Sequence, residues 1–210
     1  MITNFYIDAF NLYYGCLKGT PYKWLNLQRF CELHFPSDVV SAIHYCTARL
    51  KARPADPQQP VRQQTYLRAL GTLPSLTIHY GHYLEKKVLM PYATPPAGGP
   101  ATVRVVKSEE KGSDVNLATT LLVDAFQGKF ERAVVVSNDS DLVYPIEVVQ
   151  TLLHLPVVVL FPCGGTRKPS YHLSKVAIAS PLVKTAHLAA AQFDNLLTDA
   201  HGQFHKPTTW

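Results

Sequence analysis

Four aspartates stand at positions from which a folded chain could gather them around one metal ion. Asp8 lies at the end of an apolar run at residues 4–9, and two more acids follow the Val-rich run at residues 133–137. The fourth acid opens the clearest helical pattern of the chain, at residues 114–126. Ligands of open α/β sheets bind at the carboxyl ends of the strands, and carboxylate oxygens are ligands of Mg²⁺ and Mn²⁺. The sequence therefore predicts a metal site formed by Asp8, Asp114, Asp139 and Asp141.

Each of these acids also has a purely structural interpretation. Asp139 and Asp141 lie among turn-forming residues and could cap the helix after them. Asp8 could form an Asx turn with Asn11, and Asp114 could cap its own helix. In an extended segment two acids that are two residues apart point to the same side. They repel each other there unless a cation lies between them, which favours the metal site.

Short apolar runs alternate with helical patterns along the chain. The runs predict strands at residues 4–9, 39–47, 76–83, 133–137 and 157–161. The helical patterns cover residues 25–34, 59–70, 114–126, 146–153 and 181–197. This alternation is typical of βαβ units and a parallel sheet with both faces covered. Residues 90–100, rich in Pro, Gly and Ala, predict an exposed loop at the tip of a hairpin.

Length and composition place the chain among globular proteins. It has 210 residues, 47% hydrophobic residues and a formal net charge of +5, which is compatible with a polyanionic partner. The four cysteines form no C-x-x-C pair, so reduced thiols are expected. No signal peptide or membrane-spanning segment is recognisable, so we expect a cytoplasmic protein. We expect one domain at residues 1–180, with a C-terminal helix and tail at 181–210 packed on it. The last residues, 201–210, are expected to be frayed.

Three sequence blocks together resemble the NYN family, a branch of the PIN-like nuclease superfamily. They are YIDAFNLY at 6–13, EKGSDV at 110–115 and VSNDSDL at 136–142. The resemblance implies a PIN-like three-layer α/β fold, with a central, mainly parallel sheet flanked by helices. It also implies Mg²⁺ or Mn²⁺ as cofactor and single-stranded or structured RNA as partner. Where family members often carry a further acid, this chain has Thr120, with Asp124 one turn further along.

Carried onto this chain, the resemblance makes the four aspartates both the catalytic and the metal-binding residues. It assigns Asn11 and Ser137 to supporting hydrogen bonds at the same site. The segment after the second predicted strand is rich in arginine and lysine, which contact phosphates in nucleic-acid complexes. A solvated basic loop is the alternative. The residues expected to contact substrate are Asn11, Arg49, Lys51, Arg53, Lys111, Ser137 and Asn138.

From these observations we predict a metal-dependent endoribonuclease, a hydrolase in which metal-bound hydroxide attacks an RNA phosphodiester. Thr120 favours an alternative, a catalytically weak NYN-fold module that binds RNA or a protein. A metal phosphatase or a DNA-directed nuclease is a third hypothesis, because such acidic sites act on several phosphoesters. No membrane partner is expected. A homo-oligomer is possible, but no motif supports one.

Overall fold

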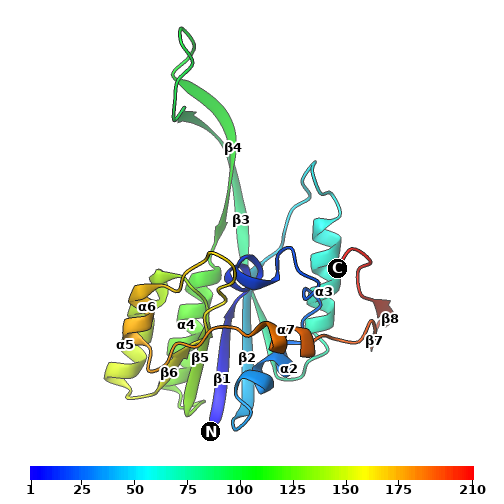
Figure 1. The fold of residues 1–210 in the computed structure, drawn as a ribbon, viewed down its shortest axis with the longest axis vertical. Coiled ribbons are helices and arrows are strands. Elements are labelled where there is room, and N and C mark those ends of the chain that lie inside the picture. Colours follow the sequence, from blue (N-terminus) through cyan, green and yellow to red (C-terminus); the bar gives the residue numbers. More distant parts are fainter.

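A six-stranded sheet forms the centre of the molecule (Figure 1). The computed structural model describes all 210 residues. The strands are β1 (Ile2–Asp8), β2 (Val39–Ala48), β3 (Leu76–Pro91), β4 (Thr102–Lys111), β5 (Arg132–Val136) and β6 (Val157–Val159). Their order is β4-β3-β2-β1-β5-β6, and only β3 and β4 are antiparallel. The chain is therefore an α/β protein with a mostly parallel sheet, as the sequence predicts.

Helices cover both faces of this sheet (Figure 1). On one face lie α2 (Leu27–His34), α3 (Gln59–Leu70) and α7 (Thr185–Ala190), and on the other α4 (Ser113–Phe126), α5 (Val143–Leu152) and α6 (Tyr171–Val176). Short helices follow two strands: α1 (Ala9–Leu12) runs into the π-helix η1 (Tyr13–Leu17), and the 3₁₀ turn η2 (Ser140–Leu142) precedes α5. The hairpin β7 (Leu196–Asp199) and β8 (Gly202–His205) forms a separate small sheet.

The alternation of side chains along β1 supplies both hydrophobic cores. Phe5 and Ile7 point into the larger core, whereas Tyr6 points into the core on the α4 side. All three residues are fully buried. A strand buried on both faces reads as a continuous apolar run, because its successive side chains point to opposite sides.

A long hairpin rises from the carboxyl edge of the sheet (Figure 1). The first part of β3 pairs with β2 up to Gly81, and the part from His82 onward pairs with β4. The predicted hairpin is thus confirmed. Its return strand delivers Lys111 and the start of α4 to the edge where β1 and β5 end.

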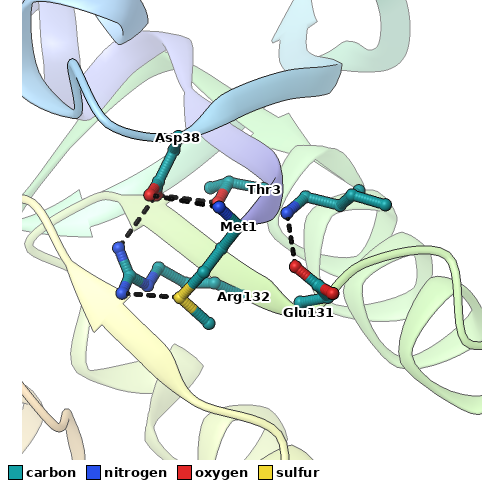
Figure 2. Close-up of polar contacts among 6 residues, drawn as sticks. Met1, Thr3, Asp38, Glu131 and Arg132 are labelled. Carbon is teal, nitrogen blue, oxygen red and sulfur yellow. Dashed lines mark hydrogen bonds and ion pairs between the residues drawn. The ribbon is translucent and has the colours of Figure 1, made fainter.

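At the opposite edge, Asp38 links the amino ends of three neighbouring strands, as Figure 2 shows. Its Oδ2 accepts hydrogen bonds from Thr3 Oγ1 on β1 and from Arg132 Nη1 on β5, both at 2.8 Å. The backbone N–H of Ile2 donates to Glu131 at 2.7 Å. These contacts hold β1, β2 and β5 together at the end away from the aspartates.

The C-terminal segment departs from the sequence prediction. A helix at residues 181–197 is wrong, because only α7 is helical there. The edge of β6 needs backbone partners: Phe161 N donates to Pro181 O, and Val183 N to Phe161 O, both at 2.9 Å. This pairing draws residues before α7 into an extended conformation. The tail at 201–210, expected to be frayed, instead forms β8 and ends with Trp210 packed against the larger core.

Two further expectations concern cysteines and membranes. All four cysteines are unpaired, as the lack of paired spacing predicts. None of the helices has the length and apolar content needed to cross a lipid bilayer.

Candidate functional site

Asp8 is a buried carboxylate at the carboxyl end of β1. Its Oδ1 accepts from the backbone N–H of Asn11 at 2.9 Å, which makes it the N-cap of α1. Its Oδ2 accepts from Asn11 Nδ2 at 2.6 Å and from Ser137 Oγ at 2.9 Å. Burial raises the pKa of Asp8, and these hydrogen bonds oppose that effect. The capping interpretation is therefore confirmed, and the side chain still belongs to the acidic edge.

Ser137 joins Asp8 to the turn that follows β5. Its Oγ also accepts from the backbone N–H of Asp139 at 3.1 Å. Asp139 in turn accepts from the backbone N–H of Asp141 at 3.0 Å and caps η2. Asp139 is partly buried and Asp141 is exposed. One hydroxyl thus fixes the loops after two neighbouring strands relative to each other.

Asp114 lies in the first turn of α4, but it is not the cap of that helix. The N-cap residue is Gly112, and the Glu110 carboxylate accepts from Ser113 N at 3.1 Å and from Ser113 Oγ at 2.7 Å. The chain turns at Gly112, whose φ of +95° favours glycine. Position 81 also requires glycine, because a Cβ there would overlap the Glu110 side chain and the Lys111 carbonyl oxygen.

The predicted acids lie close enough together for their charges to interact. Burial raises the pKa of Asp114 to about 6, and nearby negative charges add to that rise. Those charges belong to Asp8, Asp139, Glu110 and Asp141. None of the four predicted aspartates forms an ion pair with a basic side chain. No three His, Cys, Asp or Glu side chains are grouped closely enough to form a preassembled metal cage.

A loop from the far end of the chain closes over this edge. Arg167 Nη2 donates to Asn11 Oδ1, so Asn11 bridges an aspartate and an arginine. Asn138 Nδ2 donates to Lys168 O at 3.1 Å, and Ser170 N donates to Asn138 Oδ1 at 2.7 Å. Asn11 and Asn138, both expected to contact substrate, therefore position the loop around Arg167.

Three of the four basic residues expected to bind substrate contact side chains of β3 or β4. The Arg49 guanidinium lies 4.9 Å from the centre of the Tyr80 ring. Lys51 pairs with Glu85 at 3.4 Å. Likewise, Lys111 pairs with Glu109 at 3.3 Å. Arg53 lies in a turn, where its carbonyl accepts from Asp56 N at 3.0 Å.

A cavity of about 390 Å³ opens beside the acidic edge. Its wall begins with Ala9 and Phe10, directly after Asp8, and continues with Tyr45, whose pKa is raised by burial and by the Asp8 charge. Aromatic rings form much of the remaining wall: Tyr13, Tyr14, Tyr66 and Trp210. The polar groups include Thr47, Lys23, Asp56, Gln59, Arg62 and Gln63.

Asp124 does not replace the acid missing at Thr120. Its side chain is buried and forms a separate polar cluster below the site. Tyr6 OH donates to Asp124 Oδ2 at 3.0 Å, and Lys129 Nζ donates to Asp124 Oδ1 at 3.0 Å. His44 Nε2 also lies 2.9 Å from Asp124 Oδ2. These partners hold Asp124 in the core on the α4 side.

Sequence reasoning missed three contributors to the site. Glu110 is within the recognised block, but the sequence predicts no role for it. Arg167 is distant in sequence and has no motif. Trp210 reaches the cavity only because the tail packs between Trp24 and Tyr66, with ring centroids 6.4 and 5.8 Å away. In the last case the only signal in the sequence was a large apolar residue, Trp210, in a polar tail.

Two proteins that are similar to this chain bear on its fold and family. No protein-family model matches the chain. The crystal structure of a protein of unknown function from Vibrio parahaemolyticus has a TM-score of 0.55 and 16% identity, and covers 88% of this chain and 94% of that one. At that identity it supports the fold alone. The curated 6-hydroxy-3-succinoylpyridine 3-monooxygenase HspA of Pseudomonas putida is 32% identical over 99% of this chain and 75% of the relative.

The second match corrects the functional prediction. A monooxygenase is an oxidoreductase, so the predictions of an endoribonuclease and of a phosphodiester hydrolase are wrong. Acids at the end of a sheet are compatible with several chemistries, and residue types alone did not separate them. With this identity over nearly its whole length, the chain belongs to the family of 6-hydroxy-3-succinoylpyridine 3-monooxygenase.

Proposed function

We propose that this protein is an oxidoreductase of the monooxygenase class, acting on a small aromatic substrate of the hydroxypyridine type. The observation that carries the proposal is 32% identity over 99% of the chain to a protein with that activity. The cavity supports it, because 390 Å³ lies in the range of sites for small organic ligands.

The lining of the cavity suits a planar ring. Tyr13, Tyr66 and Trp210 offer aromatic faces and edges. Tyr66 is held rigidly, because its OH donates to Leu25 O at 2.8 Å. A rigid aromatic wall loses little conformational entropy when a ligand binds.

A monooxygenase reaction inserts one atom of dioxygen into the substrate. The other atom leaves as water, which requires two protons and two electrons. We assign the electrons to a hydride donor of the reduced nicotinamide or flavin class. The role of the protein is to bind and orient the ring and to exchange protons at the adjoining acidic edge.

Asp114 is the group best suited to that proton exchange. Its raised pKa of about 6 lies close to neutral pH, where a carboxyl group can both take up and release a proton. Asp8 accepts three hydrogen bonds from Asn11 and Ser137, and it serves to position these two side chains.

We further propose that the fold is PIN-like and that the acidic edge takes Mg²⁺ or Mn²⁺. Asp8, Asp114 and Asp139 offer hard oxygen donors. They have no basic partner, so a divalent cation would offset their mutual repulsion. When bound, it would supply a Lewis-acidic charge beside the cavity.

The test is oxygenation of 6-hydroxy-3-succinoylpyridine by the purified protein. The assay supplies a reduced nicotinamide, with or without flavin, in chelator or in Mg²⁺ or Mn²⁺. We expect a hydroxylated product that carries one atom of isotopically labelled dioxygen, detected by mass spectrometry. Tyr13→Leu, inside the cavity, should lower turnover, whereas the exposed Tyr80→Leu serves as the matched control. Absence of labelled product under every condition would refute the proposal.

A further inference from the structure

One ion pair lies in the wall of the cavity and joins a loop to a helix. Arg62 on α3 donates through Nη2 to Asp56 Oδ2. The Arg62 side chain is 20% exposed and that of Asp56 is 44% exposed. The arginine is therefore the inner member of the pair, and the aspartate is the member that solvent can reach.

The backbone around this pair is held by other contacts. Gln63 Nε2 donates to Ala48 O at 2.9 Å, and its Oε1 accepts from Leu50 N at 2.8 Å. These bonds fasten the start of the loop to α3. Asp56 N donates to Arg53 O at 3.0 Å, which closes a turn. The loop geometry therefore does not depend on the contact between Arg62 and Asp56.

The pair also faces the aromatic wall. Burial and the Tyr14 charge raise the pKa of Tyr13, the charge of Arg62 lowers it and that of Asp56 raises it, so the pair adjoins this ring. Lys23 is the other basic residue of the cavity, and it forms no ion pair. Only Arg62 already contacts a carboxylate, which demonstrates that a carboxylate fits against it within the cavity.

We infer that Arg62 binds a carboxylate on the substrate. In the free protein the Asp56 carboxylate occupies the position that the substrate carboxylate would take. The ligand class is a planar aromatic ring with an acidic side chain, such as the succinoyl chain in the name of the relative's substrate. The incoming carboxylate replaces that of Asp56, which turns outward to water. The identity of the aromatic ring rests on the proposed function, whereas the role of Arg62 in binding a carboxylate rests on its contact with Asp56.

Two physical features make the exchange selective. A guanidinium binds a carboxylate through two parallel N–H donors, which a neutral amide cannot match. The exchange also keeps Arg62 paired throughout, so no buried charge is left without a partner. Acidic ligands should thus bind more tightly than their uncharged analogues of the same shape.

The experiment measures binding by calorimetry, without turnover. The probes are 6-hydroxy-3-succinoylpyridine and its primary amide. The variants are Arg62→Gln and Asp56→Asn, with Arg29→Gln on the exposed side of α2 as a matched loss of one positive charge. Circular dichroism confirms that each variant is folded.

In the wild type the acid should bind about tenfold or more tightly than the amide. Arg62→Gln should weaken the acid by about 10- to 100-fold and the amide by less than about threefold. Asp56→Asn should strengthen the acid by about two- to fivefold, because the competing carboxylate is removed. Arg29→Gln should change neither.

Other outcomes overturn the inference. If Arg62→Gln lowers the affinity for the acid and for the amide equally, Arg62 has a structural role only. If the wild type does not bind the acid, the proposed binding site does not exist. Weaker acid binding in Asp56→Asn would show that Asp56 belongs to the site as a partner. If labelled product forms while Arg62→Gln retains its preference for the acid, the proposed function stands and the anchor fails.

Discussion

Replacing Asp114 by asparagine is expected to stabilise the fold above neutral pH, although the residue lies in the functional site. The structure keeps this carboxyl group in unfavourable surroundings. Burial and neighbouring negative charges raise its pKa from 3.8 to about 6; the charges are those of Asp8, Asp139, Glu110 and Asp141. The isosteric amide removes the charge and retains the shape.

The magnitude follows from the pKa difference. Each unit of pKa difference between the folded and unfolded states corresponds to about 1.36 kcal/mol, so the full difference is ~3 kcal/mol. Asp114 remains partly in contact with solvent, and we therefore expect about 1–2 kcal/mol of stabilisation in Asp114→Asn. The folded-state pKa lies above the unfolded one, so the penalty is full above about pH 6 and is relieved as the pH falls toward 3.8.

Urea unfolding in the presence of chelator measures this effect at about pH 7.5 and again at about pH 4. Asp114→Asn should raise the free energy of unfolding at the higher pH and change it little at the lower one. Asp141→Asn, at an exposed acid of the same cluster, is the control and should have a smaller effect. A pH-independent change, or destabilisation at both pH values, would show that the charges around Asp114 do not set its energy.

Further predictions concern the framework of the site. Gly15→Ala should destabilise the fold by about 3 kcal/mol in urea unfolding, because a Cβ would overlap the Pro162 carbonyl oxygen; a neutral effect would mean that this contact relaxes. Asp38→Ala should cost about 1–3 kcal/mol, since it leaves a partly buried Arg132 unpaired; thermal melting checks this, and an unchanged midpoint contradicts it. Ser137→Ala should raise the pKa of Asp8 further by removing a donor, and carboxyl NMR titration would reveal an unchanged value if the bond is unimportant.

The sequence by itself determined the fold class and the gathering of the acids. Strands such as β1 and β5 read as buried because their apolar runs are short and end in polar residues. Parallel strands bring their carboxyl ends to one edge, so Asp8 and Asp139 had to approach each other once the order of elements was known. The boundaries of α3 agree with the helical pattern residue by residue.

Other features depend on contacts between distant segments, which no local pattern records. The extended chain before α7 follows the needs of the β6 edge, against its own helical pattern. The cavity arises where α1, β2, α3 and the last residues meet. The sequence therefore could not predict that the aromatic residues of these segments line one cavity. Carboxylates at the end of a sheet are compatible with hydrolysis or with oxygenation, and the residue types alone do not separate the two. What binds beside such carboxylates depends on tertiary packing.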